Sequence, residues 1–359
     1  MDLSIRKIAA DKARTKPEDD SQLGFGRYFS NHLFCMEYDA DRGWHSPSIE
    51  PYRKLELDPA ALVFHYSQEV FDGLKAFRGK DGGIFLFRAE DYVRRLNTSA
   101  KRVCIPEFDI PFVTECIAKL VGLDHDWVPS SPGTSLYIRP VIIATEASLG
   151  VKVSSRYLLY VITCPVGSFY VKEMDPVKIA VTEKYVRAVR GSVGDVKTGG
   201  NYAASLLAAQ EAKKEGFNQV LWLDAIDRTY LEEVGTMNIF FHVGGSLWTP
   251  SLSGSIIPGI TRDTIMKMAG AWGLRIEEKR ISIREILDAH AKGEVKECFG
   301  SGTAVSIAPV SGFRFQGNEY AIGNGEAGPL AKRIYEELQQ LQRGYREDRF
   351  GWLKRVPIA

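Results

Sequence analysis

Lys197 stands in a run of residues that favours covalent chemistry. The run is DVKTGGNY, in which a threonine and then a glycine pair follow the lysine. Such small residues let the backbone pack tightly under a ligand. A lysine attacks a carbonyl when burial or a neighbouring cation keeps its amine uncharged. The spacing leaves two interpretations open, a catalytic amine or an ordinary solvated lysine.

Two adjacent carboxylates are the next candidates. Glu232 and Glu233 lie in TYLEEVGTMNIFF, where a turn leads into a strand. An acid at such a place can serve a ligand, but carboxylates are mostly caps or surface charges. Local spacing does not separate the two residues, so both remain candidates.

Two glycine-containing turns are candidates for binding an anion. In IIPGITRDTIMKMAG, Gly259 precedes a helix whose first N–H groups, near Ile260 and Thr261, have no partner within the helix and attract negative charge. In FGSGTAV, the hydroxyls of Ser301 and Thr303 accompany small residues that permit close approach. Each turn can equally be a plain loop or helix cap. Neither is a dinucleotide fingerprint, because FGSGTAV lacks the third glycine and the acidic residue expected downstream.

Composition excludes several classes of protein. The chain has 359 residues, with 46 Lys+Arg against 45 Asp+Glu, so it lacks the excess of basic residues typical of nucleic-acid-binding proteins. Its five cysteines include no C-x-x-C pair, and no Cys/His cluster predicts a metal site. The polar start has no signal-peptide core, and no apolar run reaches the roughly 20 residues of a membrane span. We therefore expect a cytoplasmic protein, without nucleic-acid or membrane partners, that binds small molecules.

The length and the order of elements predict two domains. Strands and helices alternate irregularly, which favours an α/β or α+β fold in two layers. The segment PVGSFYVKEMDP contains two prolines and a glycine, so we place a linker at 166–176 between domains at 1–165 and 177–359. The predicted helices cover 90–103, 111–121, 201–216, 261–272, 282–293 and 329–342, with Gly122 just past the end of the second, and a glycine-rich loop is predicted at 299–304.

Several motifs, in this order, resemble the branched-chain aminotransferases, which are pyridoxal-phosphate enzymes of fold type IV. The motifs are FDGLKAFRG, SLYIRP, SLGV, KTGGNY, EVGTMNIF, PGITRD and FGSGTA, and the likeness extends from about Leu23 to Trp352. The resemblance implies a smaller N-terminal α/β domain and a larger C-terminal cofactor-binding domain with a barrel-like sheet. It also implies a homodimer, in which the loop from Leu149 to Val151 reaches the neighbouring subunit's site.

The resemblance assigns cofactor-binding roles. Lys197 would form the Schiff base with pyridoxal 5'-phosphate and shuttle the substrate proton, while Glu233, and not Glu232, would keep the pyridine nitrogen protonated. Tyr202 would hydrogen-bond the cofactor's phenolic oxygen. The phosphate would be held by Arg95, by the helix start at Ile260 and Thr261, and by the hydroxyl of Thr303.

The substrate pocket implied by the resemblance has apolar walls and one arginine. It would accept leucine, isoleucine or valine and, in turn, glutamate with its γ-carboxylate, so that branched-chain 2-oxo acids and L-glutamate are formed with 2-oxoglutarate. Two fold type IV relatives, a D-amino-acid aminotransferase or an aminodeoxychorismate lyase, and a non-catalytic protein with this fold are the alternatives. The residues expected at the pocket are Tyr66, Phe71, Tyr137, Arg139, Leu149 and Val151, with Thr236 and Ala304 near the phosphate and the substrate carboxylate.

Overall fold

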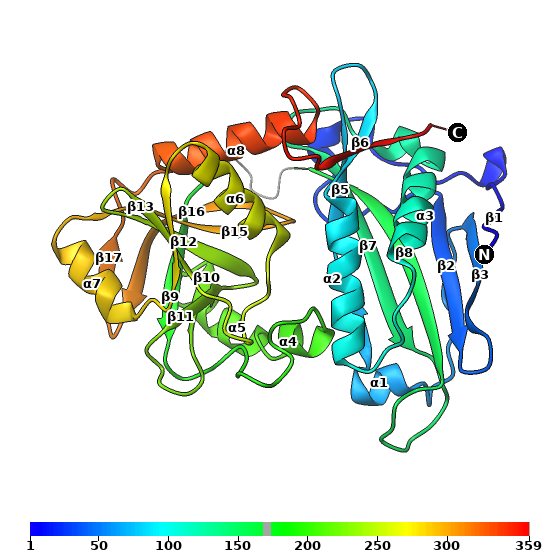
Figure 1. Ribbon diagram of the computed structural model, residues 1–359, viewed down its shortest axis with the longest axis horizontal. Helices are drawn as coiled ribbons and strands as arrows, with labels where there is room; N and C mark the ends of the chain where they lie inside the picture. Colours follow the sequence, from blue (N-terminus) through cyan, green and yellow to red (C-terminus); the bar gives the residue numbers. More distant parts are fainter. Residues whose placement is uncertain (168–173, 359) are drawn as a thin grey trace. The chain divides into compact units, whose positions relative to one another are not determined.

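The computed structural model describes residues 1–167 and 174–358, which form two compact units (Figure 1). The first unit contains Met1–Phe169, Val196–Gly199 and Gln339–Ala359, and the second contains Tyr170–Asp195 and Gly200–Leu338. The predicted linker spans the first change of unit, although its residues 168–173 lie outside the described residues. The two later segments of the first unit were assigned to the C-terminal domain. In the structure these two segments pack with the N-terminal residues.

The N-terminal unit is built on a nine-stranded sheet. Its order is β1-β3-β2-β8-β7-β5-β6-β18, with β4 paired to β7. Strand β18 comes from the end of the chain and pairs with β6, which explains why the C-terminal segment belongs to this unit. The strands are β1 (Ser4–Ile5), β2 (His32–Asp39), β3 (Gly43–Pro51), β4 (Glu69–Phe71), β5 (Leu74–Arg78), β6 (Ile84–Phe87), β7 (Ser135–Ala144), β8 (Arg156–Val166) and β18 (Leu353–Val356).

Helices α2 (Ala89–Arg102) and α3 (Ile110–Leu123) run alongside these strands, and a short α1 (Leu62–Tyr66) precedes β4 (Figure 1). In α2 the buried residues Val93, Leu96 and Ala100 repeat at helical spacing. Gly122 was expected to follow the second helix, but α3 includes it. A side chain at this position would overlap the carbonyl of Pro357, so the glycine permits close packing and does not end the helix.

The second unit contains the predicted barrel. Strands follow the order β11-β10-β9-β16-β15-β12, and β11 also pairs with β12, which closes these strands into a ring. The barrel-like sheet predicted for the C-terminal domain is therefore confirmed. The strands are β9 (Val177–Thr182), β10 (Gln219–Leu223), β11 (Leu231–Val234), β12 (Met237–Val243), β13 (Ser246–Pro250), β14 (Arg275–Lys279), β15 (Val295–Gly302), β16 (Ser306–Phe315) and β17 (Asn318–Ala321).

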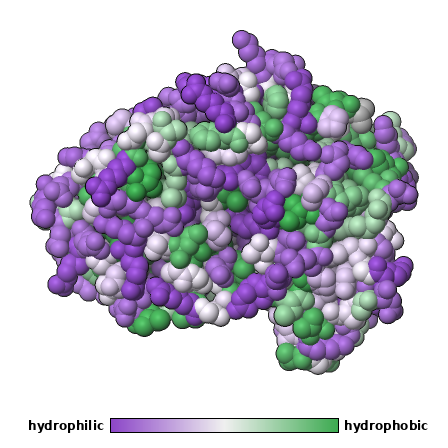
Figure 2. All heavy atoms as spheres, viewed as in Figure 1, coloured by the Kyte–Doolittle hydropathy of each residue, from purple (hydrophilic) through white to green (hydrophobic). Residues whose placement is uncertain are grey.

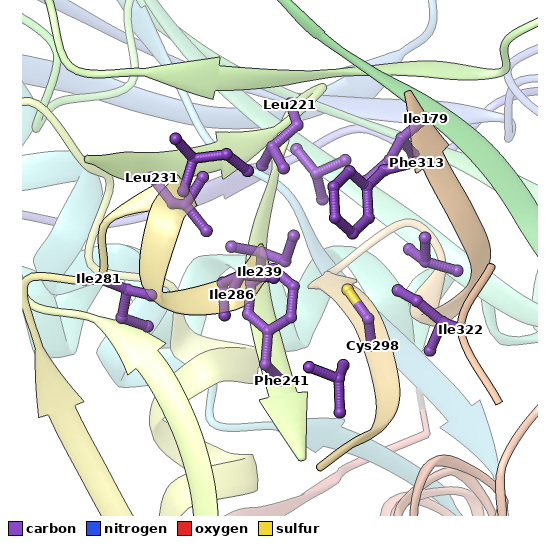
Figure 3. Packing of buried hydrophobic residues seen from close by; sticks show 14 of the residues in the cluster. Ile179, Leu221, Leu231, Ile239, Phe241, Ile281, Ile286, Cys298, Phe313 and Ile322 are labelled. Carbon is purple, nitrogen blue, oxygen red and sulfur yellow. The ribbon is translucent and has the colours of Figure 1, made fainter. Parts of the chain in front are cut away.

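Apolar side chains fill the inside of the barrel, and helices cover its outside. Along β12, Ile239 and Phe241 belong to the inner cluster shown in Figure 3, whereas Phe240 belongs to an outer one, as the two-residue period of a strand requires. Outside the barrel, α5 (Leu206–Lys214) packs against β9 and β10, while α6 (Ile260–Ala271) packs against β14 and β15. Helix α8 (Pro329–Gln342) belongs to this layer, because its Ile334 lies in the outer cluster, whereas α7 (Ile283–Ala291) contributes Ile286 to the inner cluster.

Two predicted elements of this unit were wrong in part. The helix expected at 201–216 is divided into α4 (Gly199–Ala203) and α5, and the Ser205 hydroxyl donates to the Tyr202 carbonyl at 2.7 Å, a bond that competes with the helical ladder. The loop expected at 299–304 is strand as far as Gly302, because β15 pairs with β12 on one side and β16 on the other. Tertiary pairing overrides the low strand preference of glycine here.

Candidate active site

Lys197 lies in the N-terminal unit, on the short segment Val196–Gly199. Its backbone N–H donates to Ser99 Oγ of α2 at 3.0 Å, and its carbonyl accepts from the Phe71 N–H of β4 at 3.0 Å. The side-chain Nζ lies 5.0 Å from the centre of the Phe71 ring. The backbone of Lys197 is thus fixed on both sides, and its amine lies against an aromatic surface.

Arg95 of α2 is held by a carboxylate that the sequence analysis did not single out. Its Nε donates to Asp72 Oδ2 at 2.9 Å and its Nη2 to Asp72 Oδ1 at 2.6 Å. The Asp72 side chain is fully buried, and that of Arg95 is 11% exposed. A two-point contact of this kind fixes the plane of the guanidinium group. Asp72 therefore determines where Arg95 can present its remaining N–H donors.

Tyr137 and Arg139 project from the same face of β7, since they are two residues apart. Arg139 Nη2 donates to Tyr137 Oη at 3.1 Å, and the guanidinium carbon lies 4.9 Å from the centre of the Phe71 ring. Burial raises the pKa of the Tyr137 phenol, although the charge of Arg139 opposes this shift. A Cβ at Gly73 would overlap the Tyr137 hydroxyl, so glycine is needed there. The structure thus brings three predicted pocket residues together.

An apolar tip formed by Phe64, Tyr66, Leu149, Val151 and Val153 extends from the N-terminal unit. The Tyr66 hydroxyl donates to the Leu149 carbonyl, which joins α1 to the loop that follows β7. Leu149 is 68% exposed and Val151 is 85% exposed. Figure 2 shows hydrophobic residues at the lower right of the view, at the end of the unit that carries α1. Large apolar side chains that gather in this way mark an interaction surface.

Glu233 lies in a pocket of the barrel unit. Its Oε2 is 3.1 Å from Arg187 Nε, and its Oε1 accepts from the backbone N–H of Ile257 at 2.8 Å. Both charged side chains are buried. A buried carboxylate with a cation and a backbone donor beside it can hold a positive group of a ligand. The pocket is lined by Arg187, Asn201, Tyr202, Ser205, Glu233, Gly235, Thr236 and Ile257.

Glu232 is separated from Glu233 by the structure, although spacing could not separate them. Neighbouring residues of a strand point to opposite faces. Glu232 is buried and accepts from the Ser255 hydroxyl, and it does not belong to the pocket lining. Burial raises the pKa of Glu232, and the Glu233 charge adds to this shift. Glu233 is therefore the carboxylate that faces the pocket.

The two glycine-containing turns lie at the same end of the barrel. Asn238 of β12 pairs with Ser301 of β15, and its side chain donates to the Ile257 carbonyl at 3.0 Å. Helix α6 begins at Ile260, directly after Gly259. A side chain at Gly259 would overlap the Asn238 amide, so this turn can only be made with glycine. Thr261 is buried in the first turn of α6, and Thr303 and Ala304 occupy the turn between β15 and β16.

Several charged residues around these groups escaped the sequence analysis. Asp72 and Glu69 lie in or beside the motif FDGLKAFRG, and Arg187 lies just before the glycine-broken loop that leads to Lys197. Their proximity to recognisable motifs was the available signal, but nothing in the sequence indicated that they would be buried.

Within residues 1–167 and 174–358, no group of three or more His, Cys, Asp or Glu side chains is placed to hold a metal ion. No helix of this described part combines the length and apolar character needed to cross a bilayer.

The closed barrel-like sheet with its covering helices is the fold of the class IV aminotransferases. The chain belongs to the amino-transferase class IV family, whose model matches residues 69–313. It is 49% identical over 353 residues to branched-chain-amino-acid aminotransferase 2 of Bacillus subtilis. The aligned region covers 98% of this chain and 97% of that protein. The resemblance to branched-chain aminotransferases predicted from the motifs is confirmed.

Solved structures agree with this assignment. The branched-chain amino acid aminotransferase from Escherichia coli aligns with a TM-score of 0.73 and 28% identity, covering 91% of this chain and 99% of that one. The branched-chain aminotransferase from the thermophilic archaeon Thermoproteus uzoniensis, solved with norvaline, aligns with a TM-score of 0.73 and 25% identity, covering 90% of this chain and 99% of that one.

Proposed function

We propose that this enzyme transfers the amino group between leucine, isoleucine or valine and 2-oxoglutarate, with pyridoxal 5'-phosphate as cofactor. The observation that carries the proposal is Arg139 beside the rings of Phe71 and Tyr137. Aromatic walls take up an aliphatic side chain, and a guanidinium group pairs with the γ-carboxylate of glutamate. One pocket of this composition therefore suits both donors. The whole-length similarity to the Bacillus subtilis aminotransferase supports the same substrate class.

The residues present fit the chemical groups of the cofactor. Its pyridine nitrogen needs an anion, which the buried and paired Glu233 provides. Its aldehyde needs an amine, which Lys197 provides, and its phosphate needs cations and N–H donors, which Arg95 and the start of α6 at Ile260 and Thr261 provide. Tyr202 would donate to the phenolic oxygen. When bound, this cofactor supplies an electron sink for the carbanion that forms at the substrate α-carbon.

Each side chain then has a defined role. Lys197 Nζ would hold the cofactor and would carry the proton that leaves the substrate α-carbon. The Glu233 carboxylate would keep a proton on the pyridine nitrogen. The Arg139 guanidinium binds the γ-carboxylate of glutamate, and the remaining contacts to phosphate and substrate carboxylate come from Thr236, Thr303 and Ala304.

A homodimer in the cytoplasm completes the proposal. Leu149 and Val151 are exposed on the apolar tip, and a second copy of the chain would bury them at its own site. The Tyr66 bond to Leu149 supports this, because it gives the loop a defined position before association. The five cysteines are free thiols, four of them buried, which suits a reducing compartment.

Substitution of Lys197 by alanine tests the function. We expect the variant to lose the borohydride-reducible linkage to added pyridoxal 5'-phosphate and nearly all turnover of leucine with 2-oxoglutarate. Lys213→Ala is the matched control, because Lys213 is an exposed lysine of α5. Wild-type turnover in the Lys197 variant would refute the proposal.

A further inference from the structure

We propose that Glu69 is a positioning residue for Lys197, an inference that rests on the proposed function. Glu69 and Phe71 lie on the same face of β4, two residues apart. Strand β4 is itself fixed by antiparallel pairing with β7, in which Glu69 lies opposite Ile143. The pairing with β7 thus fixes the strand from which Glu69 and Phe71 project.

Three successive residues that begin with Lys197 are bonded to this strand. The Lys197 carbonyl accepts from Phe71 N–H at 3.0 Å, and the Thr198 hydroxyl donates to the Glu69 carbonyl at 2.8 Å. The Gly199 N–H donates to the Glu69 carboxylate oxygen Oε1. The last of these is charge-assisted, and such bonds are about twice as strong as neutral ones. Glu69 therefore fixes the chain immediately after the reactive lysine.

The choice of glycine at 199 agrees with this role. A Cβ there would overlap the Glu69 carboxylate, so only glycine lets the carboxylate approach the backbone so closely. The same choice has a cost, because two consecutive glycines leave the segment more conformational freedom than other residues would. The bond from Gly199 to Glu69 removes that freedom at the residue where it would most affect Lys197.

The surroundings of Glu69 show that its carboxylate is held for this contact. The residue is half-buried, and burial raises the pKa of its carboxyl group, while the Gly199 N–H and the charge of Arg139 act in the opposite direction. Burying a carboxylate costs free energy unless the group is hydrogen-bonded or paired. Its carboxylate thus stabilises the Lys197 segment on one side and faces the electrostatic field of Arg139 on the other.

The test measures attachment and binding separately. Full-length protein stripped of cofactor is mixed with pyridoxal 5'-phosphate, and the rate of borohydride-reducible attachment is compared for Glu69→Ala, Glu69→Gln and the unsubstituted chain. Affinity for pyridoxine 5'-phosphate, which has no aldehyde, reports the binding pocket alone. Glu90→Gln is the matched control, because Glu90 is an exposed acid that pairs with Arg94 on α2 of the same unit.

Loss of a hydrogen bond to a charged group should slow attachment in Glu69→Ala by about tenfold to a hundredfold. Glu69→Gln retains an oxygen acceptor for the Gly199 N–H, so its rate should stay within about threefold of the unsubstituted rate. Pyridoxine 5'-phosphate should bind all variants alike, and Glu90→Gln should attach the cofactor normally. The pH dependence of the attached cofactor's absorbance should shift in Glu69→Ala alone.

Other results overturn the inference. An unchanged attachment rate in Glu69→Ala would show that the Gly199 bond does not position Lys197. A loss of pyridoxine 5'-phosphate affinity as large as the loss of rate would show a general structural role instead. If the unsubstituted chain formed no linkage at Lys197, the proposed function itself would fail, and that result is distinct from both.

Discussion

Replacing Asp72 by asparagine leaves the Arg95 guanidinium in its site with a neutral partner. The two side chains share contacts of 2.9 and 2.6 Å, and Asp72 is fully buried. An asparagine oxygen can still accept one N–H, but it cannot compensate the charge. Arg95 would then be a largely buried cation whose cost Asp72 no longer offsets.

The expected loss of stability follows from that burial. Removing one partner of a buried ion pair costs about 3–5 kcal/mol, and the retained single bond points to the lower end. For a domain of roughly 150–250 residues, about 1 kcal/mol changes Tm by about 2–4 °C. We therefore expect Asp72→Asn to lower Tm by about 6–12 °C.

A second ion pair on the same helix provides the control. Glu90 and Arg94 also form an acid–arginine contact on α2, but both side chains are 58% exposed. An exposed pair of this spacing contributes about 0.3–0.5 kcal/mol. Thermal unfolding of Glu90→Gln, followed by circular dichroism without cofactor, should therefore change little. Equal shifts in the two variants, or an unchanged Tm in Asp72→Asn, would refute the argument that Asp72 compensates Arg95.

Three further substitutions test the remaining assignments. Glu233→Gln should reduce kcat at saturating cofactor far more than Glu232→Gln, because Glu233 faces the pocket with a cationic partner, and equal small losses would contradict this. Arg139→Met should slow the glutamate half-reaction by about tenfold to a hundredfold and the leucine half-reaction by less, as measured by single-turnover absorbance; equal losses would indicate a structural role. Burial lowers the pKa of Lys75 from 10.5 to about 8, so the folded chain bears the full cost of the buried charge below pH 8. Lys75→Met should therefore be more stable than the unsubstituted chain at pH 7. The difference in free energy of unfolding should shrink by about 3 kcal/mol as the pH rises from 8 to 10.5, because over this range Lys75 has lost its proton in the folded state but keeps it in the unfolded state. Urea unfolding at several pH values measures this difference, which should not be constant.

Elements with strong local signals could be predicted from the sequence. Helix α8 occupies the predicted range Pro329–Gln342, and the serine and glutamate three residues apart at Ser282 and Glu285 form a capping box at the start of α7. Caps and helical periodicity depend on residues a few positions apart. Such features can therefore be predicted without knowledge of the rest of the chain.

Features that depend on distant partners could not be predicted. Gly300 lies inside β15 because the strand pairs on both sides, and a side chain there would overlap Met237 of the neighbouring strand. Composition alone indicated a loop at this place. The hydrogen bonds that attach Lys197 and Thr198 to β4 join residues more than a hundred positions apart, so no local spacing predicts them.

Charge compensation inside each unit explains why some substitutions should affect folding and others catalysis. Arg95 has Asp72 beside it, and Glu233 has Arg187, and in each case the partner belongs to the same unit. A buried charge without such a partner would be costly in the ligand-free protein.

Arg139 differs from these pairs in its exposure and in the kind of groups that surround it. It is only half-buried, and its contacts include the neutral phenol of Tyr137 and the Phe71 ring. A guanidinium that keeps access to solvent costs less to hold in the ligand-free protein, and it can still pair with the γ-carboxylate of an entering glutamate. Loss of Asp72 should thus act mainly on stability, whereas loss of Arg139 should act mainly on the choice of amino donor.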